Sequence, residues 1–88
     1  MKGDCYKECV TIISRFPNGI IRKIINKNDP WSERPEFCVE HLTGNYNLHF
    51  VIQSGDVILD PFLDEKGLIP VAEYLKTAYT NPEELCMV

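Results

Sequence analysis

The sequence predicts an α+β fold in which an N-terminal helix packs on a small, mainly antiparallel β-sheet, with C-terminal helical segments against its edge or other face. Three observations predict it: a helical apolar stripe begins at Cys5, alternating apolar residues flank a turn at Ser54-Gly55, and an amphipathic stretch follows Pro70. We expect residues 1–88 to form a single domain, because chains divide into separate cores only at several times this length.

Composition excludes several classes of protein. The chain is 44% hydrophobic and 25% charged, which is typical of a globular domain rather than a disordered one. Its 9 Lys and Arg against 13 Asp and Glu give a net charge of −4, which repels a phosphate backbone, so we expect no nucleic-acid partner. No apolar run approaches the roughly 18 residues of a membrane span, and the first residues lack a secretion signal. We therefore expect a cytoplasmic protein with no membrane partner.

The N-terminal helix is predicted from one buried stripe, with Asp4 as its N-cap. The apolar positions of the stripe are Cys5, Cys9, Ile12, Ile13 and Phe16. Pro17-Asn18-Gly19 ends the helix, and the β-branched stretch 20–25 predicts a strand. We expect residues 26–45 to form an irregular connection with a short helical turn across 35–42.

A hairpin follows. Residues 46–53 alternate as in a strand with one strongly apolar face, Ser54-Gly55 supplies the turn, and residues 56–60 return until Pro61 removes a backbone donor. Beyond the hairpin, Pro70 suits the first position of a helix, and residues 81–84 predict a final short helical turn.

The hairpin and the first helix together carry the candidate chemistry. If the strands pair symmetrically about Ser54-Gly55, His49 faces Asp60, and opposite residues are close enough to hydrogen-bond. Cys5, in the first turn of a helix, has its thiolate favoured by the unpaired amides. Cys, His and Asp form an activated nucleophile, although a His–Asp pair can also be purely structural. Cys9 is expected to be a small buried hydrophobe.

These residues also carry a resemblance. Gly3-Asp4-Cys5 at the start of a helix, and 49–52 followed by the stretch 55–61 with its Asp60-Pro61 ending, resemble the papain-like fold in its transglutaminase-like form. The resemblance implies that Cys5 is the nucleophile, His49 the general base and acid, and Asp60 the residue that orients His49. It implies thiol-dependent acyl transfer (hydrolysis, deamidation or transamidation) on a protein or peptide substrate, with no cofactor.

The sequence departs from that family in two respects, and one is that its length is near the minimum for the fold. Papain-like enzymes place an oxyanion-stabilising side chain before the nucleophile, and only four residues precede Cys5. The amide of Cys5, Trp31, Asn45 or Asn47 could replace it, and the loss of one such donor costs about 10²–10³ in rate. A non-catalytic protein-binding module on the same fold is therefore the alternative function.

A zinc site is a further alternative for the cysteines. In a chain without a secretion signal we expect reduced thiols, which pack, react or bind metal. Cys5, Cys9, Cys38 and His41 form C-x₃-C and C-x₂-H pairs, which could hold a tetrahedral zinc ion. The C-x₃-C spacing is not the common C-x₂-C knuckle, so we expect no metal ligands. Cys86 belongs neither to the predicted catalytic site nor to this alternative zinc site.

Overall fold

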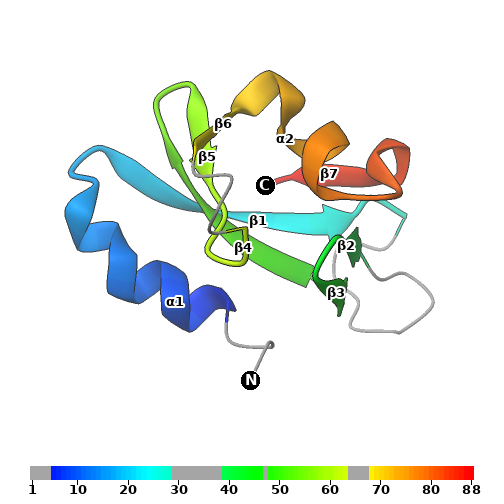
Figure 1. Cartoon of the computed structure of the whole chain (residues 1–88), viewed down its shortest axis with the longest axis horizontal. Helices are drawn as coiled ribbons and strands as arrows, with labels where there is room; N and C mark the ends of the chain where they lie inside the picture. The colour runs from blue at the N-terminus through cyan, green and yellow to red at the C-terminus, as the bar shows by residue number, and fades with distance from the viewer. Residues whose placement is uncertain (1–4, 29–38, 47, 64–67) are drawn as a thin grey trace.

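The computed structural model describes residues 5–28, 39–46, 48–63 and 68–88. It has an α+β fold: an N-terminal helix packs on a curled five-stranded antiparallel sheet that forms a half-barrel, with one C-terminal helix (Figure 1). The helical elements are α1 (Cys5–Ile12), η1 (Ile13–Arg15), α2 (Val71–Ala78) and η4 (Pro82–Glu84). The strands are β1 (Gly19–Asn26), β2 (Val39–His41), β3 (Gly44–Tyr46), β4 (Leu48–Ser54), β5 (Val57–Leu59), β6 (Leu68–Pro70) and β7 (Leu85–Met87).

The sheet is built around the long pair β1 and β4. Its strand order is β6-β5-β4-β1-β7, and every neighbouring pair is antiparallel. Strands β2 and β3 form a separate hairpin. Backbone hydrogen bonds from Leu42 to Ala78 (3.0 Å) and from Thr80 to Glu40 (2.9 Å) attach this hairpin to the end of α2. The attachment fixes β2 relative to the sheet.

Strand β4 is covered on both faces, whereas the alternation predicts a single apolar face. His49 and Val51 are fully buried on one face, and Ile52 is fully buried on the other. Tyr6 of α1 packs edge-on against Phe50, so α1 covers the face that Phe50 shares with Ile52. A central strand between two layers buries its polar positions as well as its apolar ones, which is why His49 lies inside the protein.

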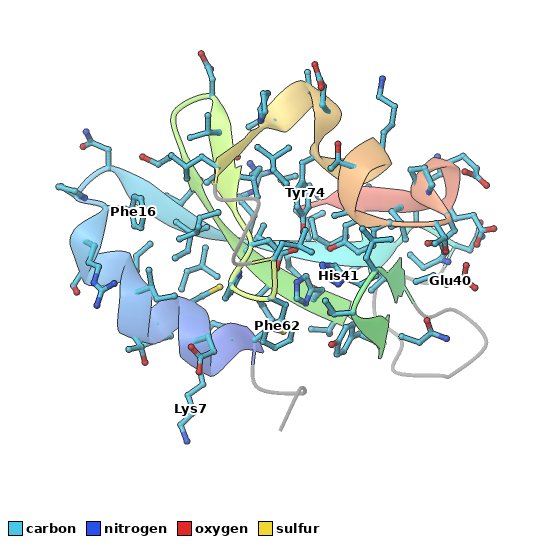
Figure 2. All side chains as sticks on the ribbon, viewed as in Figure 1. Lys7, Phe16, Glu40, His41, Phe62 and Tyr74 are labelled. Atoms are coloured by element: carbon cyan, nitrogen blue, oxygen red, sulfur yellow. The ribbon has the colours of Figure 1, made fainter. Side chains whose placement is uncertain are left out.

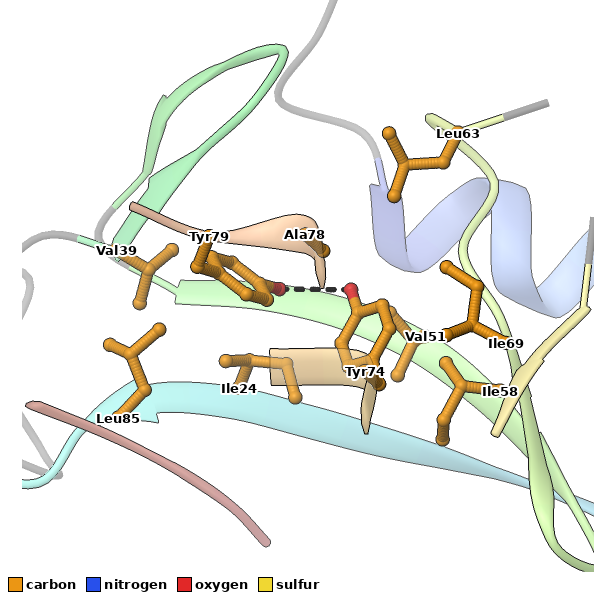
Figure 3. Close-up of a cluster of buried hydrophobic side chains, with 10 residues drawn as sticks. All are labelled: Ile24, Val39, Val51, Ile58, Leu63, Ile69, Tyr74, Ala78, Tyr79 and Leu85. Atoms are coloured by element: carbon orange, nitrogen blue, oxygen red, sulfur yellow. Dashed lines mark hydrogen bonds between the residues drawn. The ribbon is translucent and has the colours of Figure 1, made fainter. Parts of the chain in front are cut away.

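The main core lies on the opposite face of the sheet from α1 (Figure 3). Its members come from the sheet, from the β2–β3 hairpin, from α2 and the residue after it, and from the segment after β5: Ile24, Val39, Val51, Ile58, Leu63, Ile69, Tyr74, Ala78, Tyr79 and Leu85. Two of them are polar, and the hydroxyls of Tyr74 and Tyr79 hydrogen-bond to each other at 3.0 Å. This apolar layer keeps water from the polar groups that it surrounds.

The elements differ from the sequence-based expectations at several short segments. The helix at Cys5, the strand within 20–25, the hairpin strands and the turn at Pro82–Glu84 are present. The helical turn expected across 35–42 is wrong at 39–41, which form β2, while the earlier residues of that segment lie outside the described ones. Pro70 is the N-cap of α2 rather than its first residue. Strands β3, β6 and β7 were not predicted, because three residues carry too little periodicity.

Within the residues that the structure describes, neither α1 nor α2 nor a shorter turn has the length and apolar character needed to cross a bilayer. Asp4, the expected N-cap of α1, is outside these residues.

Candidate functional site

A buried carboxylate is the centre of the candidate site. Asp60 follows β5 and is fully buried. Its Oδ2 accepts hydrogen bonds from His41 Nε2 (2.7 Å) and from the Tyr74 hydroxyl, and its Oδ1 accepts from His49 Nε2 (3.0 Å) and the Phe62 amide (2.9 Å). Burial alone would raise the pKa of Asp60, but the hydrogen bonds from His41 and His49 and the charge of His49 hold it well below its usual value. The carboxylate is therefore ionised inside the core.

The hairpin brings His49 to Asp60 by a register that differs from the symmetric one. Strand β4 pairs Ser54 with Val57, so the turn is Gly55-Asp56 rather than Ser54-Gly55. Gly55 has a φ of 62°, the left-handed conformation that a two-residue hairpin loop with glycine first requires. The prediction that His49 faces Asp60 directly is thus wrong by two residues, and the two side chains meet diagonally. A shift of two residues keeps both on the same face, and a diagonal is within reach of a long side chain.

His49 is held tightly on all sides. Its ring stacks on Tyr46 (centroids 5.3 Å apart, interplanar angle 26°) and also contacts Phe62 (5.3 Å) and His41 (4.6 Å). Nε2 hydrogen-bonds to Asp60, while Nδ1 has no hydrogen-bond partner in the part of the chain described. Burial lowers the pKa of His49, but hydrogen bonding and charge from Asp60 and Cys5 outweigh burial and raise the pKa to about 9. His49 therefore carries a proton on each nitrogen at neutral pH.

Cys5 lies beside His49, at the start of α1. The Phe50 amide donates a hydrogen bond to Cys5 Sγ at 3.4 Å, which places the sulfur next to the backbone of the residue after His49. Burial would raise the pKa of the thiol, but the polar and electrostatic attraction of His49, with the amides of Phe50 and Tyr6, lowers it below its usual 9.0. Although no hydrogen bond of ordinary geometry joins Sγ to Nδ1, the pair favours a thiolate and an imidazolium.

Cys9 lies one turn further along α1 and is chemically the opposite of Cys5. It is fully buried, and burial together with the charges of Cys5 and Asp60 raises its pKa to about 12. Cys9 is thus a protonated thiol in the core, as expected of a small buried hydrophobe. The helix presents one activated and one inert cysteine to the same layer.

His41 belongs to this site through Asp60, whereas the sequence suggested it only as a zinc ligand. Figure 2 shows His41 in the interior of the protein. The Thr43 amide donates a hydrogen bond to His41 Nδ1 (3.1 Å), and the Thr43 hydroxyl lies 2.7 Å from the same nitrogen. Because Nδ1 accepts, the ring proton is on Nε2, which donates to Asp60. The sequence signal is weak: His41 and Thr43 belong to a short hairpin, and the contact with Asp60 depends on how that hairpin attaches to the sheet.

The zinc interpretation of His41 finds no support in this arrangement. Both ring nitrogens of His41 are engaged in hydrogen bonds, and Cys38 lies outside the described residues. A different set, His41, His49 and Asp60, has its nitrogen and oxygen atoms within 4.8 Å of one another. In this structure the carboxylate of Asp60 accepts a hydrogen bond from Nε2 of each of the two histidines.

Of the side chains considered for an oxyanion hole, Asn45 is exposed on β3. Trp31 and Asn47 lie outside the described residues. Of these three candidates, the structure thus describes only Asn45.

Comparison with protein-family models, with curated proteins and with solved structures finds no match for this chain.

Proposed function

We propose that the protein is a thiol-dependent acyl-transfer enzyme with a papain-like, transglutaminase-like core, acting on the amide or ester carbonyl of a protein or peptide. The observation that carries the proposal is the position of His49, which bonds Asp60 through Nε2 and is coupled to Cys5. A core histidine with a structural carboxylate needs no thiol partner, and a packed cysteine needs no lowered pKa. The combination of both is the arrangement of an activated nucleophile.

The proposed reaction uses the charges of the resting site. The Cys5 thiolate attacks the carbonyl carbon and forms a C–S bond, and the carbonyl π electrons move to oxygen. As the oxyanion collapses, the imidazolium of His49 gives its Nδ1 proton to the leaving amine or alcohol. His49, now neutral, accepts a proton from the water or amine that attacks the thioester, and Cys5 leaves as the thiolate. Asp60 stays ionised throughout and keeps the Nε2 proton of His49 in place.

The ring contacts of His49 support this role. Tyr46 stacks on one side and Phe62 packs at 44°, so the imidazole cannot rotate freely about χ2. A base that is held in one orientation loses little entropy when the substrate binds. The same aromatic enclosure reduces solvent at the pair and strengthens its electrostatics.

A small activated ester such as p-nitrophenyl acetate tests the proposal without a known substrate. The full chain should form an acetyl thioester at Cys5, detected by peptide mass spectrometry, and should then turn over. Cys5→Ala should abolish both, and Cys86→Ala, a half-buried position on β7, should leave them unchanged. His49→Gln should slow acylation at least ~10²-fold. If Cys5 is never acylated in the folded chain, the non-catalytic binding module becomes the better assignment.

A further inference from the structure

We infer that His41 is a positioning residue for the Cys5–His49 pair: by donating its Nε2 proton to Asp60 Oδ2, it fixes the carboxylate so that Oδ1 meets His49. The inference rests on the proposed function, because it assigns a role within the same site. It adds a fourth side chain, from the separate β2–β3 hairpin, to a site otherwise made by α1, β4 and the residue after β5.

The two oxygens of Asp60 are held from different directions. Oδ1 is held by His49 and the Phe62 amide, whereas Oδ2 is held by His41 and the Tyr74 hydroxyl. Each oxygen therefore has two donors, and without His41 the Tyr74 hydroxyl alone would hold Oδ2. The second donor on Oδ2 makes rotation of the carboxylate more costly, and the direction in which Oδ1 meets the His49 ring therefore depends in part on His41.

The tautomer of His41 matters as much as its position. The amide of Thr43 donates to Nδ1, so His41 can donate to Asp60 without carrying a positive charge. The rings of His41 and His49 are 4.6 Å apart, and a second imidazolium at that distance would oppose the first. The hairpin therefore keeps one ring neutral so that the other can hold the charge.

The other titratable groups around Asp60 do not compete for that charge. Burial raises the pKa of Tyr74 on α2, and burial likewise raises that of Tyr79 just after α2, so both remain neutral hydroxyls. Burial also keeps Cys9 of α1 protonated, with a pKa of about 12. Among the residues that the structure describes, the charged groups near Asp60 are then His49 of β4 and, next to it, Cys5 of α1. A substitution of His41 should consequently change the reactivity of the Cys5 thiol.

The pH profile of Cys5 alkylation by iodoacetamide, followed by peptide mass spectrometry on the full chain, tests the inference. His41→Leu removes the donor, and at neutral pH the rate should fall about tenfold, with the profile displaced to higher pH. His41→Gln, whose amide nitrogen takes the place of Nε2, should restore the rate to within about threefold of the parent. Leu42→Gln, at an exposed position of the same hairpin, should change nothing.

The outcomes separate the inference from the proposed function. If the parent chain itself has an ordinary thiol profile at Cys5, the proposed function fails. If the parent profile is lowered and a folded His41→Leu variant keeps it, the inference is overturned while the enzyme survives. Should His41→Leu not fold, ¹⁵N-histidine spectra of the parent chain decide: a neutral Nε2–H tautomer at His41 is expected, and an Nδ1–H or doubly protonated ring overturns the inference.

Discussion

His49 Nε2 and Asp60 Oδ1 meet at 3.0 Å across a diagonal of the β4–β5 hairpin, not across a directly opposed pair. The contact therefore requires only that His49 and Asp60 lie on the same face of the hairpin, which more than one strand register allows. A register shift of two residues leaves both side chains on the core face, whereas a shift of one would turn Asp60 to the other face. Inserting or deleting one residue at the Gly55 turn should consequently disrupt the site.

Gly55→Ala tests that turn. With a φ of 62°, an alanine is strained by about 1–2 kcal/mol, and no atom within 4 Å of the added Cβ contributes a clash. Urea unfolding should show a loss of about that size, and Gly55→Asn, which tolerates the left-handed region, should lose less. Equal stability of the Ala variant and the parent would argue against the Gly55-Asp56 turn.

Cys5 and Cys9 offer an internal comparison, since both are buried on α1. The pKa of Cys5 is lowered and that of Cys9 is raised to about 12, so near neutral pH the thiolate fraction of Cys5 exceeds that of Cys9. Iodoacetamide should modify Cys5 at least about a hundredfold faster than Cys9, measured by quantitative peptide mapping of the native chain. Similar slow rates at both positions would contradict the thiolate–imidazolium pair. The ratio should collapse in urea, where both thiols are exposed.

The proximity of His49 and Asp60 could be anticipated from the sequence because both residues belong to one short hairpin. An amphipathic stripe places Cys5 in the first turn of a helix, and a short hairpin restricts which side chains can meet His49. The contact of Cys5 with Phe50, by contrast, needed α1 to lie along β4, which periodicity alone does not specify.

The contacts of His41 and Tyr74 with Asp60 could not be anticipated from the sequence, and the reason is physical. Each reaches Asp60 from an element that no local rule connects to the hairpin: β2 through its attachment to the end of α2, and α2 through the closing of the core. The burial of both faces of β4 has the same origin. Alternating polarity along a strand predicts that one of its faces is buried. In β4, however, α1 packs on one face and Tyr74 lies on the other, so both faces are buried.

Asp60→Asn should damage both stability and reactivity. One oxygen becomes an amide that faces donors, so two of the four hydrogen bonds to this side chain lose their acceptor. We expect a loss of about 3 kcal/mol in the free energy of unfolding and, in the folded fraction, at least tenfold slower alkylation of Cys5. Asp56→Asn, an exposed position in the turn, is the matched control and should change neither. Unchanged Cys5 reactivity in Asp60→Asn would mean that another group orients His49.

The pH dependence of stability carries a signature of the Cys5–His49 pair, because their shifts have opposite signs. The pKa of His49 rises from 6.5 to about 9 on folding, so its contribution is fully present below about 6.5 and is lost as the pH rises through about 9. The pKa of Cys5 is lowered from 9.0, so its contribution is present above 9.0 and is lost as the pH falls. Between these values the two slopes oppose each other, and Asp60, with a pKa well below its usual value, does not titrate.

Removing the thiol should therefore expose the His49 slope. In Cys5→Ala, the pKa of His49 loses the part of its rise that comes from Cys5 but keeps the part that comes from Asp60, so the free energy of unfolding should still decline as the pH rises above about 6.5. The parent chain should be flatter over the same range, and Cys5→Ala combined with His49→Gln should lose the decline altogether. Urea unfolding at a series of pH values between about 6.5 and 9 measures all three. A decline of equal steepness in the parent and in Cys5→Ala would show that Cys5 stays protonated in the folded state, and the thiolate assigned to it would have to be abandoned.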